Sequence, residues 1–181
     1  MITIFKACGR ALAGSRLGKL IDTDRRGHLE QVLVEAATQK KITLAVAESC
    51  TGGLIASRIT DVSGSSQVFL GGVTAYADAT KIAILGVSAA TLQRHGAVSE
   101  ICALEMVRGI YQLTGASFCA SVTGIAGPSG GSDEKPVGTV FVAYLMNGVE
   151  SVEKHFFPFR REVFKKLVSS LVLRKLWQAC Q

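Results

Sequence analysis

One segment in the first third of the chain restricts the fold more than any other. Residues Ile42–Ala47 form a nearly continuous apolar run, which is typical of a strand covered on both faces. Small and polar residues follow at once, over Glu48–Gly53, and apolar residues then recur at helical spacing from Leu54. A buried strand, a tight turn and a helix in this order predict an α/β fold, in which functional groups gather where the strands end.

The rest of the chain alternates between strand and helix patterns. Ser88 and Ser99 are expected to begin two helices as N-caps, and Gly115 to end the second. The dipeptide Asn147-Gly148 predicts a β-hairpin, so the sheet is not purely parallel. We therefore predict a three-layer α/β/α sandwich with a mixed, mostly parallel sheet. The strands are expected at 42–47, 68–76, 118–122, 137–145 and 149–157. The inner face of the last helix is expected to consist of Val163, Leu167, Val168, Leu171 and Val172.

Length and composition fit one compact domain. The chain has 181 residues, 48% of them hydrophobic, which is enough to bury a core without disulfides or metals. We predict a single domain over residues 27–181, preceded by an N-terminal extension over residues 1–26. For that extension the sequence leaves open an extra helix, a flexible frayed tail, a start codon placed too far upstream and an organelle-targeting segment. The apolar runs are of strand length, far below the ~20 residues of a membrane span, so no membrane association is expected.

The distribution of charge and of cysteines argues against several classes of function. The formal net charge is +6, but basic residues concentrate at the two ends of the chain and are not interleaved with aromatic residues, so nucleic-acid binding is not expected. The five cysteines include no C-x-x-C pair and the three histidines are scattered, so we expect neither a zinc site nor a disulfide framework. Free thiols fit a reducing compartment, and we predict a cytoplasmic location. Neither a metal nor another cofactor is expected.

Three segments rich in small residues interrupt the apolar pattern: Ala47–Gly53, Val73–Lys81 and Thr123–Gly131. In the first, Ser49 falls on the turn between strand and helix, where the first amides of the helix have no helical partner. Such amides are donors suited to an oxyanion or a phosphate. The residues alone also allow a structural role, in which Ser49 or Thr51 caps the helix and the glycines permit close packing.

The second and third segments carry a lysine and a glycine-rich loop. Lys81, beside an apolar stripe, can act as general base on a serine hydroxyl if it is buried and neutral; the alternative is a solvated lysine paired with Asp78. Because a base must be neutral, we expect Asp78 to face solvent and Lys81 to face a pocket beneath Ser49. The glycines after Thr123 let backbone amides approach a ligand, and an ordinary loop is the alternative.

In combination, these segments resemble the CinA C-terminal domain family. Each motif alone is weak, but together they span His28 to Trp177 in family order. The motifs are Ala47-Glu-Ser-Cys-Thr-Gly-Gly53, Gly64-Ser-Ser66, Tyr76 with Lys81, Gly96-Ala-Val-Ser99 and Thr123-Gly-Ile-Ala-Gly-Pro128. The resemblance implies a hydrolase, a nicotinamide-nucleotide amidase that converts nicotinamide mononucleotide (NMN) to nicotinate mononucleotide and ammonia in pyridine nucleotide salvage.

The resemblance also implies roles for individual residues. Ser49 would be the nucleophile and Lys81 its base, with Tyr76 close by. Cys50 is a rival nucleophile because a thiol attacks more readily than a hydroxyl, but we expect it to point into the core. The expected substrate-binding residues are Thr51, Gly52, Thr123, Gly124 and Arg160, of which Thr123 and Arg160 would hold the phosphate. The expected partners are the nucleotide substrate and further copies of the chain, in a dimer or larger homo-oligomer.

The chain departs from the family pattern at two places. Gly-Asp-Arg is common before the last helix, where Pro158-Phe-Arg160 stands here, so Arg161 is an alternative to Arg160 at the phosphate. The common Tyr-Ser-Asn is Tyr76-Ala-Asp78 in this sequence, which alters the pocket. Longer family members carry an N-terminal domain linked to nucleotide pyrophosphatase chemistry, and an activity of that kind is not expected from these 181 residues. The alternative function is a non-catalytic nucleotide-binding protein, CinA-like and associated with competence or DNA damage.

Overall fold

Strands and helices alternate through the part of the chain that the structure describes. This computed structural model describes residues 29–181, so the predicted extension over residues 1–26 lies outside the described residues. Within residues 29–181, no helix has the length and apolarity to span a membrane. The elements are α3 (Leu29–Lys40), β1 (Leu44–Glu48), α4 (Leu54–Thr60), the 3₁₀ helix η1 (Ser65–Gln67), β2 (Phe69–Thr74), α5 (Asp78–Leu85), α6 (Ala89–His95), α7 (Glu100–Thr114), β3 (Phe118–Gly124), β4 (Thr139–Met146), β5 (Val149–Phe156) and α8 (Arg161–Ala179).

The described residues form one mixed sheet of five strands in the order β2-β1-β3-β4-β5. β1 lies at the centre of a parallel group, paired with β2 on one side and β3 on the other. β4 runs antiparallel to both β3 and β5, so four strands point one way and β4 alone points the other. The parallel group brings the carboxyl ends of β1, β2 and β3 to one edge of the sheet, where the segments with polar residues follow them.

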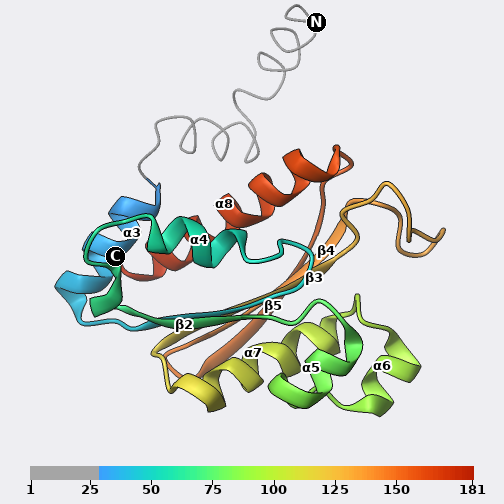
Figure 1. The fold of residues 1–181 in the computed structure, drawn as a ribbon, viewed down its shortest axis with the longest axis horizontal. Coiled ribbons are helices and arrows are strands. Elements are labelled where there is room, and N and C mark those ends of the chain that lie inside the picture. Colours follow the sequence, from blue (N-terminus) through green and yellow to red (C-terminus); the bar gives the residue numbers. More distant parts are fainter. Residues whose placement is uncertain (1–28) are drawn as a thin grey trace, which may run out of the picture.

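Helices cover both faces of the sheet, as Figure 1 shows. α3, α4 and α8 pack on one face and α5, α6 and α7 on the other, and each layer has its own core cluster. The side chains of β1 alternate between the two clusters, with Leu44 and Val46 in the first and Ala45 and Ala47 in the second. The predicted three-layer α/β/α sandwich is therefore confirmed.

The turns and helix ends explain why the chain folds at these positions. Ser88 and Ser99 each accept a hydrogen bond at the start of a helix, and left-handed Gly115 ends α7. Asn147 and Gly148 have φ values of 52° and 78°, which are the left-handed conformations that a two-residue hairpin turn requires. The predicted helix caps and the hairpin are confirmed.

The close approach of α5 and α7 gives a prediction about stability. A Cβ at Gly109 in α7 would lie 2.1 Å from the carbonyl oxygen of Leu85 at the end of α5. Because backbone cannot yield as a side chain does, Gly109→Ala is expected to lower the free energy of unfolding by about 3 kcal/mol or more. Equilibrium denaturation in urea measures this change.

Gly86→Ala is the matched control. A Cβ at Gly86 would meet nothing within 4 Å, but its φ of 66° is left-handed, so the expected loss is about 1–2 kcal/mol. If Gly109→Ala lowered the free energy of unfolding no more than Gly86→Ala does, the close contact between α5 and α7 would not limit the size of the residue at position 109.

Candidate active site

A cavity of about 200 Å³ lies at the carboxyl edge of the parallel strands. It is bounded by residues that follow β1 and β2, by the end of β3 and the loop after it, by the segment between α6 and α7, and by the first turn of α8. Of the predicted site residues, it brings together Ser49, Tyr76, Lys81, Thr123 and Gly124. The remaining lining residues are Cys50, Asp78, Ala97, Val98, Ala126 and Arg161. Residues far apart in the sequence thus meet where the α/β fold places its functional groups.

The alternation of β1 directs successive side chains to opposite faces of the sheet. Glu48 hydrogen-bonds to α4, and Cys50 belongs to the core cluster of α3, α4 and α8. Ser49, between them, lines the cavity together with Lys81 of α5. Burial raises the pKa of the Cys50 thiol to about 12, so the rival nucleophile remains a protonated thiol at neutral pH.

Backbone hydrogen bonds hold the turn that carries Ser49. The Ser49 amide donates to the Val122 carbonyl of β3 (3.1 Å), and the Gly52 amide donates to the Ser49 carbonyl (3.0 Å). Gly52 and Gly53 have φ values of 61° and 86°, which only glycine adopts without strain. Thr51 is buried in the same turn, but neither it nor Gly52 lines the cavity. The part predicted for these two residues in binding substrate stays a prediction.

Lys81 is 1% exposed, and its amine meets two oxygens. Nζ donates to the Tyr76 carbonyl and to Asp78 Oδ1, both at 3.2 Å. The Asp78 side chain is 59% exposed, as expected of a residue that faces solvent. Its carboxylate nevertheless pairs with the Lys81 amine, so the expectation that the two groups would be separate is wrong. A buried ammonium needs polar partners, and a carboxylate three residues earlier on the same helix is within reach.

Arg161 reaches the cavity, whereas Arg160 does not line it. The guanidinium of Arg161 donates to the Tyr76 hydroxyl (2.7 Å) and to the Gly127 carbonyl (3.2 Å). It therefore links the loop after β2 to the glycine-rich loop after β3. Arg160 is the exposed N-cap of α8. Lys165, one turn after Arg161, lies near the Ser49 turn, because a Cβ at Gly52 would be 3.5 Å from its Nζ.

Thr123 and Gly124 occupy the end of β3. The Thr123 hydroxyl donates to the Ala97 carbonyl at 2.6 Å, so its proton is already engaged. Gly124 lies so close to β4 that a Cβ would be 2.7 Å from the Thr139 carbonyl oxygen. Thr123 can hold a phosphate as a hydrogen-bond donor only by giving up its bond to Ala97.

The contacts of the Glu48 carboxylate were not predicted from the sequence. This carboxylate accepts hydrogen bonds from the Ile55 and Ala56 amides at the start of α4, at 3.1 and 2.8 Å. The expectation that the first amides of this helix are unpaired is wrong for these two. The available signal was the alternation of β1, which turns Glu48 to the α4 face of the sheet.

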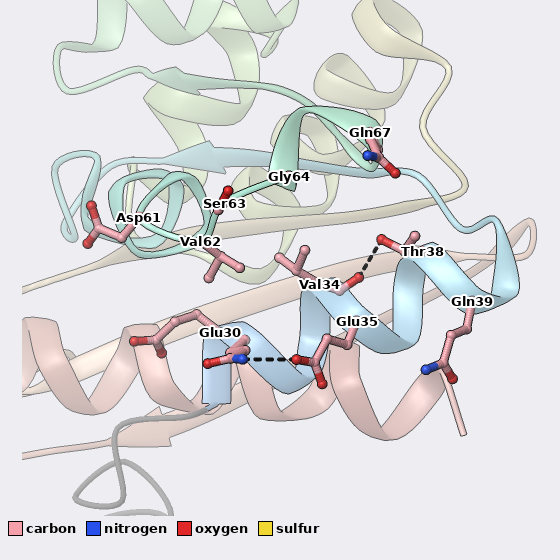
Figure 2. Close-up of a pocket in the computed structure, with 11 residues that line it drawn as sticks. Glu30, Val34, Glu35, Thr38, Gln39, Asp61, Val62, Ser63, Gly64 and Gln67 are labelled. Carbon is pink, nitrogen blue, oxygen red and sulfur yellow. Dashed lines mark hydrogen bonds between the residues drawn. The ribbon is translucent and has the colours of Figure 1, made fainter.

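A second, larger cavity of about 630 Å³ lies between α3 and the loop after α4, and Figure 2 shows residues that line it. Its lining includes the carboxylates of Glu30, Glu35 and Asp61 and none of the predicted site residues. Two of these carboxylates have partners, since Glu30 pairs with Arg58 at 2.8 Å and Glu35 accepts from Gln31 at 2.9 Å. Over residues 29–181, no three His, Cys, Asp or Glu side chains gather as a metal site would require.

Comparison with known proteins identifies the family. The sequence profile of the CinA C-terminal domain matches residues 26–180. A CinA superfamily protein from Klebsiella pneumoniae has a solved structure with a TM-score of 0.81 and 32% identity, covering 84% of this chain and 96% of that one. The competence/damage inducible protein CihA from Agrobacterium tumefaciens has a TM-score of 0.80 and 37% identity, with the same two coverages.

Curated relatives are longer than this chain. A CinA-like protein from Thermotoga maritima is 57% identical over 114 residues, which are 63% of this chain and 28% of that protein. A CinA-like protein from Geobacter sulfurreducens is 42% identical over 167 residues, which are 92% of this chain and 40% of that protein. The chain thus spans well under half the length of these relatives. It belongs to the CinA C-terminal domain family.

Proposed function

We propose that this chain is a nicotinamide-nucleotide amidase that hydrolyses NMN to nicotinate mononucleotide and ammonia. The observation that carries the proposal is that Ser49 and the buried Lys81 line one small cavity, with Tyr76 and Arg161 beside them. Membership of the CinA C-terminal domain family supports it. The cavity of about 200 Å³ suits the carboxamide end of the substrate, and the ribose phosphate then extends towards Arg161.

The proposed reaction proceeds through an ester of Ser49. Ser49 Oγ attacks the carboxamide carbon while the neutral amine of Lys81 takes the hydroxyl proton. The C–N bond then breaks, and the Lys81 ammonium gives this proton to the leaving nitrogen, which departs as ammonia. Water attacks the ester and gives its proton to Lys81, which returns a proton to Ser49 as nicotinate mononucleotide leaves.

Backbone amides of the Ser49 turn are the donors that we assign to the oxyanion. The Gly52 amide already donates to the Ser49 carbonyl, so the candidate donors are the amides of Cys50, Thr51 and Gly53. A donor of this kind is typically worth ~10²- to 10³-fold in rate. Asp78 pairs with the Lys81 amine at 3.2 Å, and the base of this mechanism is that amine in its neutral form.

Arg161, rather than Arg160, is expected to bind the phosphate. Arg161→Ala should raise KM for NMN by about 10- to 100-fold, since a charged hydrogen bond is worth about 1.5–3 kcal/mol. KM for nicotinamide riboside, which lacks the phosphate, should change little. Steady-state ammonia release measures both values.

Arg160→Ala is the matched control for this prediction, because it removes the same charge from the neighbouring, exposed position. It should leave KM for NMN near the wild-type value. If Arg160→Ala raised KM and Arg161→Ala did not, the phosphate would belong to Arg160.

Ammonia release from purified protein and NMN tests the proposed activity. We expect one ammonia and one nicotinate mononucleotide for each NMN consumed. Binding of NMN without any product would overturn the amidase proposal and support a non-catalytic nucleotide-binding protein instead.

A further inference from the structure

We propose that Glu48 is a positioning residue for catalysis, which holds the turn bearing Ser49 in its reactive geometry by fixing the start of α4. This inference rests on the proposed amidase activity of the same site. It concerns a side chain that does not line the cavity and does not touch the reacting atoms.

The contacts of Glu48 are those of a helix cap supplied from a strand. Its side chain is 1% exposed, and its two oxygens accept from the Ile55 and Ala56 amides at 3.1 and 2.8 Å. The N-cap residue itself, Gly53, has no side chain to satisfy those amides. Glu48 therefore takes the place of the usual N-cap side chain, from the residue immediately before Ser49.

Backbone bonds fix the other side of the same turn. The Glu48 carbonyl accepts from the Ala75 amide at 2.8 Å, and the Ser49 amide donates to the Val122 carbonyl. The end of β1 is thus tied to both neighbouring strands, and the Glu48 carboxylate ties it to α4. Between these anchors, the chain passes through two left-handed glycines, Gly52 and Gly53.

The position of the nucleophile depends on both anchors. Without the carboxylate, the first turn of α4 loses two hydrogen bonds, and the residues between Ser49 and α4 are free to shift. A misplacement of about 1 Å at a reacting group is enough to lower a rate about 10²-fold. The carboxylate also places a negative charge at the start of α4, which disfavours a substrate phosphate there and leaves it to Arg161.

Glu48→Gln tests the inference. Glutamine keeps one acceptor oxygen but turns an NH₂ group towards a backbone N–H, donor against donor. We expect kcat for NMN to fall about 10- to 100-fold with KM nearly unchanged, because the substrate contacts remain. Glu48→Asp keeps the carboxylate on a side chain that is one methylene shorter, so its kcat should lie between those of Glu48→Gln and the wild type. It also serves as the test variant if Glu48→Gln does not fold.

Glu105→Gln is the matched control. Glu105 of α7 also accepts from the start of a helix, at the Ser88 amide (2.9 Å) and the Thr91 hydroxyl (2.7 Å) of α6, and none of these three residues lines the cavity. It should lower the unfolding temperature and leave kcat near the wild-type value. A Glu48→Gln enzyme with wild-type kcat would overturn the inference, and so would equal kcat losses in the two variants.

Hydrogen exchange separates this inference from the amidase proposal. Amides of residues 49–56 should exchange faster in Glu48→Gln than in the wild type, whether or not the wild type turns over NMN. If the wild-type protein is inactive, the amidase proposal fails alone, and unchanged exchange in Glu48→Gln would overturn the Glu48 inference by itself.

Discussion

Ser49→Ala is expected to lower kcat for NMN by about 10⁴-fold or more, because the serine hydroxyl is the atom that forms the covalent intermediate. Folding should be near normal, since the Ser49 backbone bonds to Val122 and Gly52 do not involve the hydroxyl. Binding of NMN should persist because the residues assigned to the phosphate are untouched. Ammonia release measures the rate, and calorimetry measures the binding.

Cys50→Ala is the control for this substitution. The Cys50 thiol has a pKa of about 12, so it is almost entirely protonated near neutral pH and becomes a thiolate only as the pH approaches that value. Its removal should leave kcat close to the wild-type value. Loss of activity in Cys50→Ala with retention in Ser49→Ala would mean that Cys50, and not Ser49, is the nucleophile.

Lys81→Arg is expected to lower kcat about 10³-fold despite keeping a positive charge, because arginine stays protonated at any working pH and cannot accept the serine proton. Lys81→Met should be equally inactive, since it keeps a similar volume in this buried position and has no amine. Both rates come from the same ammonia assay, with circular dichroism to confirm that the variants fold.

A Lys81→Arg enzyme with turnover close to the wild type would contradict the assignment of Lys81 as the base. The lysine would then supply charge only, and another group would have to accept the proton. Inactive Lys81→Met combined with active Lys81→Arg would lead to the same conclusion.

The strand–turn–helix pattern predicted the location of the site better than the identity of any single residue did. A continuous apolar run must be buried on both faces, and a parallel strand in such a sheet ends where its neighbours end. That reasoning placed Ser49 at the carboxyl edge of the sheet, and the resemblance to the CinA C-terminal domain family added Lys81 and Thr123 to the same site. The structure places all three around one cavity.

The first turn of α8 was predicted one residue out of phase. Val163 was expected on the inner face, but Val163 is 38% exposed and its neighbour Phe164 is 0% exposed. The same shift separates Arg160 from Arg161. Helix ends are poorly determined by sequence because side-chain periodicity sets the phase only over several turns, and a departure such as Pro158-Phe159 removes the motif that would fix it.

Glu48 was missed for a different reason. Acidic side chains are rarely buried, so sequence alone favours solvent for Glu48. Its partners are set by tertiary structure, because Glu48 meets α4 only where β1 turns it to that face. Such a contact has no local sequence signature, whereas the pair of Asp78 and Lys81, three residues apart on one helix, has one.

Trapping with hydroxylamine tests the central claim, that Ser49 forms an ester with the substrate, most directly. Hydroxylamine attacks an ester intermediate in place of water, so the wild-type enzyme should convert NMN partly to the hydroxamate of nicotinate mononucleotide, in a proportion that rises with hydroxylamine concentration. Mass spectrometry identifies this product, and a reaction without enzyme corrects for direct attack on NMN. Formation of the hydroxamate by the wild type and not by Ser49→Ala is the result we predict. Nicotinate mononucleotide alone at every hydroxylamine concentration, or no product from NMN, would contradict it.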